Sequence, residues 1–419
     1  MQEVDFDICI IGAGASGLVS AIESSRRGLS CVVVDKNKKP GNKLYATGNG
    51  RCNLTNDDYE DETYYENDFV DRVYDTLYEI TGHRQRSFVV DYFKKLGVNT
   101  VNKDGYIYPA SLQASTVVWA LTDTALSLGC KIVNRATAVS IEREDIYKIN
   151  LLIRQDGEEE SFFVKARNII IATGGLSQEK LGAASRDLSD SLLGSMGIPY
   201  NEYESALCPV TLNEYVKSLS GVRTKCIISV NGHTESGELQ ITDTGFSGIA
   251  VFNLAYYMSP GDIISVNLLP KVSEDEFAES FNALKESFPG KRLDLFLNGF
   301  INDKLATYMI KRFYGTDELG LLLKDVTETG IRGLYQEITE WKVVVRCRNG
   351  FDQSQASSGG IITSNINPKT MQINPLVTIG NGIYAVGEAT DVLGKCGGYN
   401  LTYAFVSGYI AGHSISRYQ

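Results

Sequence analysis

The feature that most constrains the fold is a glycine motif near the start of the 419-residue chain. An apolar run, residues 6–11 (FDICII), leads into GAGASG at 12–17, and small and apolar residues follow at helical spacing over 15–28. A second apolar run, 31–34, ends at Asp35. A strand, a glycine turn, a helix and a second strand ending in an acid form the βαβ unit that binds dinucleotides.

Each position of the motif has a physical role. Gly12 permits the tight turn, Gly14 lets the backbone approach a pyrophosphate, and Gly17 lets the helix pack on the strand. The helix N-terminus adds free N–H groups and the positive end of a dipole. Asp35 can accept hydrogen bonds from a ribose and disfavours a 2′-phosphate, which points to FAD or NAD rather than NADP. The alternative is a glycine turn with a purely structural role.

Composition and charge narrow the class of protein. Hydrophobic residues make up 43% of the chain and charged residues 22%, as in ordinary soluble globular proteins, and the length suits two or three domains. A net charge of −11 and a pI near 5.0 argue against nucleic acid or an anionic membrane as the main partner, because both need a basic face. We therefore expect a small-molecule substrate, with no nucleic acid and no membrane as partner. The oligomeric state is not revealed.

Metal-binding and targeting signals are weak. The eight cysteines include no C-x-x-C pair and the three histidines are far apart, so no metal site is expected. The N-terminus, MQEVDFDICIIG, lacks a basic segment followed by a long apolar one, and no run approaches the roughly 20 apolar residues of a membrane span. A reducing cytoplasm is the expected compartment.

The end of the chain favours FAD over NAD. A strand at 383–386 is followed by Gly387-Glu388, and a helix opens at Gly397-Gly398. This arrangement resembles the closing element of the glutathione-reductase-like FAD fold, in which an acid meets the ribitol and the last helix points its N-terminus at the flavin. Such a helix end stabilises the negative charge of reduced flavin. Glu388 is the first choice for the ribitol contact and Asp391 the second; a solvated acidic loop is the alternative for both.

Two further stretches fit this interpretation. The apolar run at 169–171 ends in Ala172-Thr173-Gly174-Gly175, a recurrent element of the same fold. Residues 46–56 (ATGNGRCNLTN) are poor in helix and strand formers and rich in exposed backbone N–H groups. We expect residues 41–56 to run along the pyrophosphate and flavin, with Arg51 and Lys43 neutralising phosphate. The alternative for Arg51 is a surface charge. Cys52, beside Arg51, is a candidate for a thiol of lowered pKa.

The chain resembles the BaiN/YhiN-type bacterial NAD(P)/FAD-dependent oxidoreductases, some of which are described as aminoacetone-oxidase-like. The resemblance rests on IGAGASGL at 11–18, KLYATGNGRCNLTN at 43–56, IIIATGG at 169–175, GELQITDTGFSG at 237–248 and GEATDVLGKCGGYNLTYAFVSGYIAG at 387–412. It implies non-covalent FAD. Carried over by motif, the cofactor residues are Gly12, Gly14, Gly17, Asp35, Lys43, Gly50, Arg51, Cys52, Asn53, Gly387, Glu388, Asp391, Gly398, Tyr399 and Asn400. Within or beside the same motifs, Ala15, Ser16, Lys36, Thr47, Gly48, Ala172, Thr173 and Gly174 complete the expected set.

The expected fold class is α/β: a discontinuous, glutathione-reductase-like FAD-binding Rossmann domain with an inserted β-rich, barrel-like domain and a small helical subdomain. Residues 1–190 are expected to form the first part of the FAD-binding domain, and 336–419 its closing part. Short alternating runs place the β-rich domain at 191–272, and charged, helix-like sequence places the helical subdomain at 273–335.

Three functional hypotheses follow. The first is an oxidoreductase that passes a hydride through flavin N5, with NAD(P)H reducing an enone or other activated alkene. The second is an amine or amino-ketone oxidase that uses O₂; the third is a flavin-binding regulatory protein without turnover. Without a second G-x-G-x-x-G, NAD(P)H would bind only transiently. Tyr399, Cys396, Arg51 and Tyr108 are the candidates for protonation or substrate orientation. Substrate identity is not carried over, because Lys395-Cys396 and Ser357-Ser358 depart from the family pattern.

Overall fold

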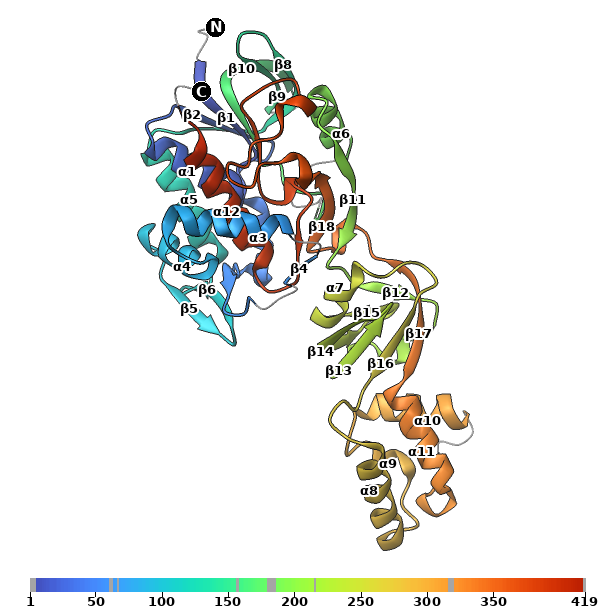
Figure 1. Cartoon of the computed structure of the whole chain (residues 1–419). Helices are drawn as coiled ribbons and strands as arrows, with labels where there is room; N and C mark the ends of the chain where they lie inside the picture. Colours follow the sequence, from blue (N-terminus) through green and yellow to red (C-terminus); the bar gives the residue numbers. More distant parts are fainter. Residues whose placement is uncertain are drawn as a thin grey trace. The chain divides into compact units, whose positions relative to one another are not determined.

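The chain forms two compact units in the computed structural model (Figure 1). Unit 1 comprises residues 1–205 and 355–419, and unit 2 comprises residues 206–354. The structure describes residues 5–59, 63–65, 68–155, 158–178, 186–214, 216–315 and 320–416. Unit 2 is therefore an insertion between two segments of unit 1.

Unit 1 is built on a seven-stranded sheet in the order β7-β2-β1-β10-β9-β8, with β19 also paired to β10. Strands β7, β2, β1, β10 and β19 pair in parallel, whereas β10-β9 and β9-β8 are antiparallel. Strands β1 and β2 and the last residues of β10 are buried runs rich in β-branched residues, as expected for strands covered on both faces, whereas β7 at the edge is only partly buried. The bounds are β1 (Asp5–Ile11), β2 (Cys31–Asp35), β7 (Lys131–Asn134), β8 (Ala136–Arg143), β9 (Tyr147–Gln155), β10 (Glu158–Ile171) and β19 (Ile383–Ala385).

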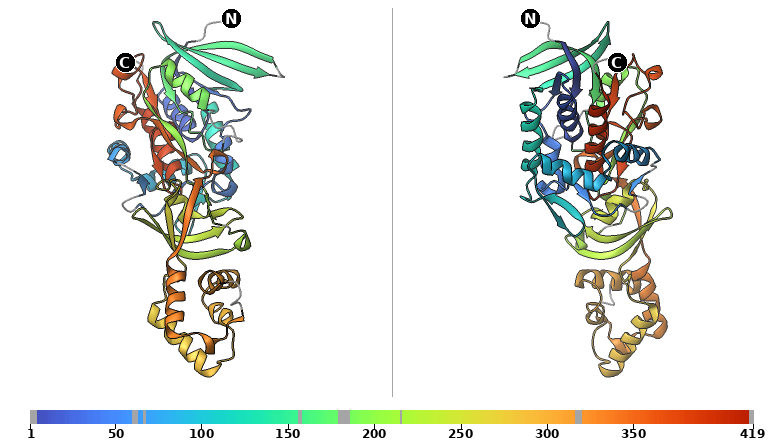
Figure 2. Two further views of the ribbon diagram at one scale, coloured as in Figure 1. Left: turned by 90° about the vertical axis from the view of Figure 1, so that its right-hand side faces the viewer. Right: turned by 60° about the vertical axis from the view of Figure 1, so that its left-hand side comes forward.

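Strand β10 serves both parts of this sheet. Residues 158–166 of β10 pair with β9, and residues 165–171 of β10 pair with β1. Figure 2 shows the antiparallel strands β8–β10, in teal and green, extending beside the N-terminus. The parallel half of β10 ends at Ile171, so the Ala172-Thr173-Gly174 turn lies at the carboxyl edge of the sheet next to the ends of β1 and β2.

Two helices far apart in sequence pack side by side in unit 1. Helices α1 (Ala15–Arg26) and α12 (Tyr399–Ser414) approach so closely that a Cβ on Gly408 would lie 2.4 Å from the Ser16 carbonyl oxygen (Figure 1). The Ser20 hydroxyl donates to the Gly408 carbonyl oxygen at 3.0 Å. The last helix of the chain is thus held against the dinucleotide-binding motif at its beginning.

The other elements of unit 1 cover the sheet and one end of it. The helices are α2 (Asn42–Ala46), α3 (Asp68–Thr81), α4 (Gln85–Lys95), α5 (Ala114–Ser127) and α6 (Arg186–Ser195). Small sheets are formed by β3 (Thr55–Asn56), β6 (Tyr106–Pro109) and β5 (Thr100–Lys103), by β4 (Tyr64–Tyr65) and β20 (Leu393–Gly394), and by β11 (Tyr200–Ala206) and β18 (Ala356–Ile361).

Unit 2 contains a closed barrel and a group of helices. The barrel order is β12-β15-β14-β13-β16-β17, which confirms the expected barrel-like insertion. Its strands are β12 (Val210–Leu212), β13 (Arg223–Val230), β14 (His233–Ile241), β15 (Gly245–Ser247), β16 (Ile263–Asn267) and β17 (Trp341–Arg348). The helices are α7 (Ile249–Ala255), α8 (Glu274–Ser287), α9 (Leu293–Leu297), α10 (Asp303–Tyr314) and α11 (Glu328–Thr339). One apolar cluster runs through both barrel and helices.

The observed units have boundaries at 205/206 and 354/355, compared with the expected 190/191 and 335/336. The second difference has a clear cause. Trp341 to Arg348 forms β17, which pairs with β12 and β16 and so belongs to the barrel rather than to the closing part of the FAD-binding domain. The four-segment division of the sequence itself stays a prediction.

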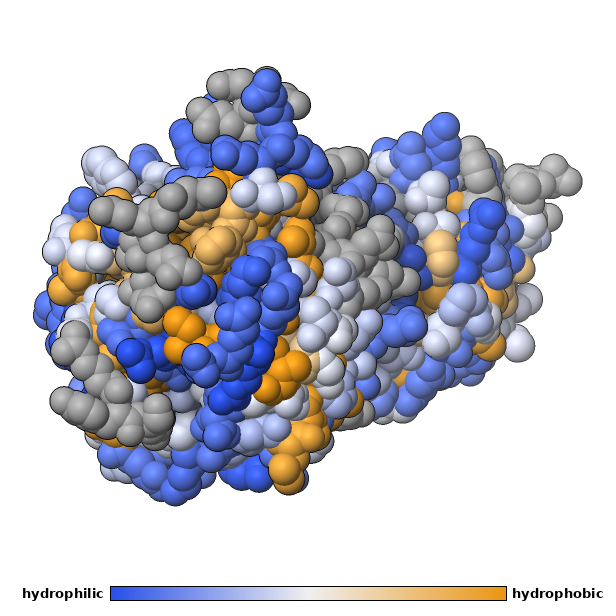
Figure 3. Space-filling view, turned by 90° about the horizontal axis from the view of Figure 1, so that it is seen from above, coloured by the Kyte–Doolittle hydropathy of each residue, from blue (hydrophilic) through white to orange (hydrophobic). Residues whose placement is uncertain are grey.

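The surface is mostly hydrophilic on the face shown in Figure 3, where small apolar areas (orange) lie among polar ones (blue). Among the described residues, no helix has both the length and the apolar character needed to cross a membrane. In the same part of the chain, no three His, Cys, Asp or Glu side chains are grouped so that they could hold a metal ion.

Candidate functional site

A pocket with about 900 Å³ of atom-free volume lies at the carboxyl edge of the sheet in unit 1. Turns that follow β1, β2 and β10 form its wall, together with α2, the start of β18, the segment after β19 and the first turns of α12. This is where open α/β sheets bind their ligands. The residues predicted from sequence that line it are Gly12, Gly14, Ala15, Ser16, Asp35, Lys43, Thr47, Ala172, Thr173, Gly174, Glu388 and Asn400.

The three motif glycines have different surroundings. A Cβ on Gly12, whose φ is +112°, would lie 2.2 Å from the Ala172 carbonyl oxygen, and one on Gly17 would lie 2.0 Å from the Gly12 carbonyl oxygen. Both glycines are therefore required by the packing of the turn itself. A Cβ on Gly14 would meet no protein atom within 4 Å. Gly14 thus faces open space in the pocket, as a backbone that lies against a bound pyrophosphate must.

Asp35 ends β2 with its side chain buried at the pocket wall. One carboxylate oxygen accepts a hydrogen bond from the Ala13 N–H at 2.7 Å, and the other accepts from the Asn37 N–H at 2.7 Å. Burial raises the pKa of Asp35, and the two backbone hydrogen bonds oppose that rise. The carboxylate therefore fixes the turn between β1 and α1 and keeps free lone pairs, which a ribose hydroxyl can approach from the pocket.

Glu388 joins four segments at the opposite wall. Its carboxylate pairs with the Lys43 Nζ at 2.6 Å and accepts hydrogen bonds from the Ser357 N–H at 2.8 Å and the Ser177 hydroxyl at 3.1 Å. Burial raises the pKa of Glu388, but the Lys43 charge and these hydrogen bonds outweigh burial and leave the pKa below its ordinary value. The group is therefore an anion held among donors, not an acid in a solvated loop.

The loop that follows α2 carries an exposed cation. Arg51 follows η1 (Thr47–Gly50), where Gly48 and Asn49 have φ of +57° and +55°. Arg51 is exposed, and its positive charge opposes the rise that burial causes in the pKa of Tyr108 on β6. A Cβ on Gly48 would lie 3.4 Å from the Tyr108 ring. The Arg51 charge therefore acts on the Tyr108 hydroxyl, and Gly48 of the same loop lies beside the Tyr108 ring.

Cys52 behaves differently from the sequence hypothesis. Its side chain is fully buried, and burial raises the pKa of the thiol to about 12. The suggestion of a lowered pKa was wrong, because the neighbouring Arg51 side chain points to the surface while the Cys52 side chain points into the core. Cys52 has a positive φ of 58° and serves to turn the chain back toward β3.

The N-terminus of α12 meets this loop. A Cβ on Gly398 would lie 3.1 Å from the Asn53 side-chain amide. The Asn400 side chain donates to the Gly394 carbonyl oxygen and accepts from the Gly394 N–H, both at 2.8 Å, and so fixes the segment between β20 and α12. Cys396 lies in that segment, with its Sγ 3.7 Å from the Gln355 side-chain oxygen.

Several predicted residues lie outside the pocket lining. Gly17 and Gly387 pack within the fold, and the Tyr399 ring is buried against Tyr59 and Tyr64. Asp391 accepts hydrogen bonds from the Gly359 N–H at 3.0 Å and the Asn201 side chain at 2.6 Å. Lys36, Gly48, Gly50, Arg51, Cys52, Asn53, Gly398, Tyr108 and Cys396 are also not among the lining residues.

Three further lining residues, Gly41, Asn42 and Leu44, fall within the range 41–56 that was expected to run along the cofactor. Sequence reasoning missed the other lining residues: Ala13, Asn37, Gln355, Ala356, Leu401 and Ala404. Ala13, Asn37, Leu401 and Ala404 are neighbours of predicted residues, so their position in the motifs was the available signal. Gln355 and Ala356 follow the inserted unit and carry no motif. Only the fold brings them to the pocket.

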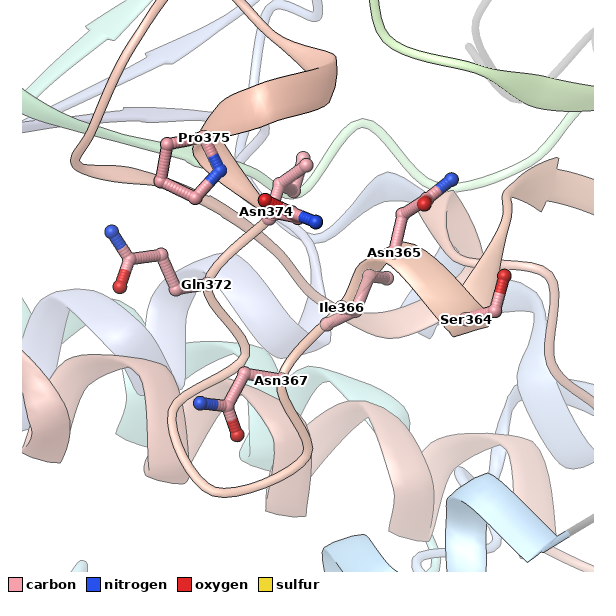
Figure 4. Close-up of a pocket in the computed structure, with 8 residues that line it drawn as sticks. Ser364, Asn365, Ile366, Asn367, Gln372, Asn374 and Pro375 are labelled. Carbon is pink, nitrogen blue, oxygen red and sulfur yellow. The ribbon is translucent and has the colours of Figure 1, made fainter.

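A second pocket in unit 1 has a different character. Figure 4 shows Asn365, Asn367, Gln372 and Asn374 around it, with Ser364, Ile366 and Pro375. Asn367 and Asn374 accept hydrogen bonds from the Lys369 and Leu376 N–H groups and so stabilise their own turns. Its lining contains no titratable side chain, and the pocket offers no acid–base chemistry.

One geometric observation fits FAD to the first pocket: a Cβ on Gly14 would meet no protein atom within 4 Å, which leaves room for a pyrophosphate. Outside the pocket lining, the buried Asn53 side-chain oxygen has no hydrogen-bond partner among the described residues, and such an acceptor is costly unless a ligand or water supplies a donor. Gly12 to Gly17, Asp35, Lys43 and Glu388 would hold the adenosine diphosphate and ribitol portions.

The chain is similar over nearly its whole length to proteins of known name. The chain is 29% identical over 98% of its length to the 3-dehydro-bile acid delta(4,6)-reductase of Clostridium scindens, covering 99% of that protein. It is also 29% identical over 97% of its length to the ribosomal RNA dihydrouridine synthase of Haemophilus influenzae, covering 98% of it. A 3-ketosteroid-Δ4-(5α)-dehydrogenase from Rhodococcus jostii matches with 14% identity and a TM-score of 0.47, over 99% of this chain and 97% of that one.

The second of these relatives bears on the partner prediction. Its name refers to ribosomal RNA, which is in tension with the expectation, drawn from an acidic pI, that nucleic acid is not a partner. The model of the HI0933-like protein Rossmann domain matches residues 6–414. The chain therefore belongs to the HI0933-like Rossmann-domain family, a family of FAD-dependent oxidoreductases.

Proposed function

We propose that this enzyme is a reductase that transfers a hydride to an alkene conjugated to a carbonyl group, with NAD(P)H as the source of electrons. The observation that carries the proposal is the meeting of three segments at the N-terminus of α12. Gly48, in the loop that carries Arg51, lies beside the Tyr108 ring, Asn53 of the same loop packs on Gly398, and the Asn56 side chain donates to the Gly397 carbonyl oxygen at 2.9 Å. Polar donors thus surround the helix end that faces a flavin in such folds.

The chemistry divides between cofactor and protein. FAD, once reduced by NAD(P)H, would supply the hydride for the alkene. Addition of a hydride to the β-carbon of an enone places negative charge on the carbonyl oxygen, and Arg51 is suited to stabilise that charge. Burial raises the pKa of Tyr108, so its hydroxyl stays protonated at neutral pH and is available as a proton donor to the α-carbon. Cys396 and Tyr399 remain further candidates for this step.

The proposed substrate class rests on the two relatives. One is named for the reduction of a 3-dehydro-bile acid and the other for the synthesis of dihydrouridine. In both names the product lacks a double bond that is conjugated to a carbonyl group. A steroid-like enone is the first candidate substrate; uridine in ribosomal RNA is a second candidate, favoured by the equal identity of the two relatives.

An anaerobic titration tests the proposal. Purified protein loaded with FAD is titrated with NADH and, separately, NADPH while the flavin absorbance is followed. Loss of the oxidised flavin band with one nucleotide, and its return on addition of a 3-oxo-4-ene steroid or of uridine-containing ribosomal RNA, is the expected result. Flavin that neither nucleotide reduces, but that an amine or amino-ketone reduces with peroxide formed in air, would instead support the oxidase alternative.

Two substitutions test the assigned roles. Arg51→Met is expected to slow flavin reoxidation by the alkene about 100-fold, the loss typical of one oxyanion donor, without changing flavin reduction. Tyr108→Phe is expected to slow the same step and to abolish its solvent isotope effect. Tyr78→Phe, at an exposed tyrosine of α3, is the matched control. Equal effects on both half-reactions would contradict these roles.

The compartment proposed for this chemistry is the cytoplasm. All eight cysteines are free in the structure, as a reducing compartment allows. Cys9, Cys31 and Cys130 are buried in the core of unit 1, and burial raises the pKa values of their thiols. They have no role in the proposed reaction.

A further inference from the structure

The two strands that connect the units form a small sheet of their own. β11 runs to Ala206, where the chain enters unit 2, and β18 begins at Ala356, directly after the chain returns at Gln355. The two strands pair with each other, and a Cβ on Gly359 would lie 2.2 Å from the Glu202 carbonyl oxygen. We call residues 200–206 and 355–361 the connecting ribbon.

Two acids of one short segment hold this ribbon. Asp391 accepts a hydrogen bond from the Gly359 N–H on β18 at 3.0 Å and from the Asn201 side chain on β11 at 2.6 Å. Glu388 accepts from the Ser357 N–H at 2.8 Å and the Ser357 hydroxyl at 3.0 Å. One carboxylate therefore joins both strands, and the other is bonded to the start of β18.

The same segment reaches the cofactor pocket. Glu388 lines the pocket and pairs with Lys43, which also lines it. Gln355 and Ala356, the first residues of the ribbon after unit 2, line it as well. The pocket wall therefore includes both the acid that bonds to β18 and the first residue of β18 itself.

We propose that Glu388 and Asp391 are positioning residues that couple occupancy of the cofactor pocket to the order of the connecting ribbon. Asp391 fastens β11 to β18, and Glu388 ties β18 to the pocket wall through Ser357 and Lys43. FAD bound in the pocket would stabilise this arrangement by shielding from water the wall that contains Glu388, Lys43 and Ala356. The inference rests on the proposed binding of FAD and assigns to Asp391 a role other than ribitol contact.

Hydrogen exchange measures this coupling directly, because Ser357 and Gly359 donate through their backbone amides and β11 pairs with β18. Exchange is followed by mass spectrometry on peptides covering 200–206 and 355–361, in apo protein and in protein saturated with FAD. FAD is expected to slow exchange in both peptides. Asp391→Asn is expected to speed exchange in both peptides at least about tenfold, with or without FAD, while visible absorption still reports bound FAD.

A matched control exists in unit 2. Asp262 likewise accepts from one backbone N–H, that of Ser259 at 2.7 Å, and from one asparagine side chain, that of Asn231 at 2.8 Å. Asp262→Asn is expected to speed exchange near Ser259 and to leave the ribbon peptides unchanged. Glu388→Gln is expected to remove the FAD-dependent part of the protection, measured at saturating FAD.

The outcomes separate the two proposals. Bound FAD with unchanged exchange in the ribbon peptides would overturn the coupling and leave the cofactor assignment intact. The role of Asp391 would be overturned if the ribbon peptides exchange no faster in Asp391→Asn than in Asp262→Asn. This comparison applies to apo protein as well as to protein loaded with FAD. Failure of the wild-type protein to bind FAD at all would overturn both the proposed function and the coupling.

Discussion

Gly14→Ala separates folding from cofactor binding. The backbone at Gly14 is extended, with φ −86° and ψ −164°, and a Cβ there meets no protein atom within 4 Å. Alanine fits this conformation, so the unfolded chain loses freedom and the apo protein gains about 0.4–1 kcal/mol of stability. The added methyl group occupies space that the pyrophosphate needs. Loss of one charge-assisted hydrogen bond costs about 1.5–3 kcal/mol, which raises the Kd for FAD by about 10- to 150-fold.

The assay combines thermal unfolding of the apo protein with fluorescence titration by FAD. Gly350→Ala is the control, because Gly350 is also extended (φ −70°, ψ 177°) and also faces open space, but lies in unit 2. Gly350→Ala should raise the stability of the apo protein by a similar amount to Gly14→Ala and leave the affinity for FAD unaltered. Wild-type affinity in Gly14→Ala would refute the assignment of the pocket to the pyrophosphate. A lower unfolding temperature of apo Gly14→Ala than of apo wild type would refute the conclusion that a Cβ at Gly14 meets no protein atom.

The remaining predictions concern stability, pH and thiol reactivity. Gly17→Ala should cost several kcal/mol of unfolding free energy, seen in thermal melts even without FAD, because its Cβ would lie 2.0 Å from the Gly12 carbonyl oxygen. The pKa of Glu388 is lowered in the folded protein, so above the unfolded-state pKa near 4.5 the unfolding free energy of the wild type should exceed that of Glu388→Gln by about 2 kcal/mol. This advantage should be lost as the pH falls through the folded-state pKa. A difference in unfolding free energy that stays constant from pH 3 to 8 would contradict this. Native protein treated with iodoacetamide at pH 8 should be modified at the exposed Cys347 and not at Cys52, because burial raises the pKa of the Cys52 thiol to about 12. Mass spectrometry of the labelled peptides identifies the modified cysteines, and early labelling of Cys52 would count against its burial.

Local patterns predicted the elements that surround the pocket. The glycine motif, the acid at the end of β2 and the turn at Ala172-Thr173-Gly174 each carry their own signal in a few adjacent residues. They are brought together because parallel strands place their carboxyl ends at one edge of a sheet. Asp35, Lys43 and Glu388 could therefore be assigned to one site before any coordinates were known.

The parts that were missed depend on long-range pairing. Trp341 to Arg348 alternates like any strand, and nothing within it shows that its partners are β12 and β16. Cys52 was judged by its neighbour Arg51 in sequence, although a residue of positive φ can direct its side chain away from that neighbour. Asp391 resembled Glu388 in sequence context, yet its oxygens are bonded to Gly359 and Asn201. Such partners are set by tertiary structure.

The pairing of β11 with β18 also bears on how the chain acquired its present form. The chain leaves unit 1 after β11 and returns to it just before β18, and these two strands pair with each other. Unit 2 therefore occupies the position that a loop between two paired strands would otherwise have. Deletion of residues 206–354 and closure with a few glycine and serine residues would convert the ribbon into a simple connection within one polypeptide. The Rossmann framework and the module it carries can then diverge at different rates.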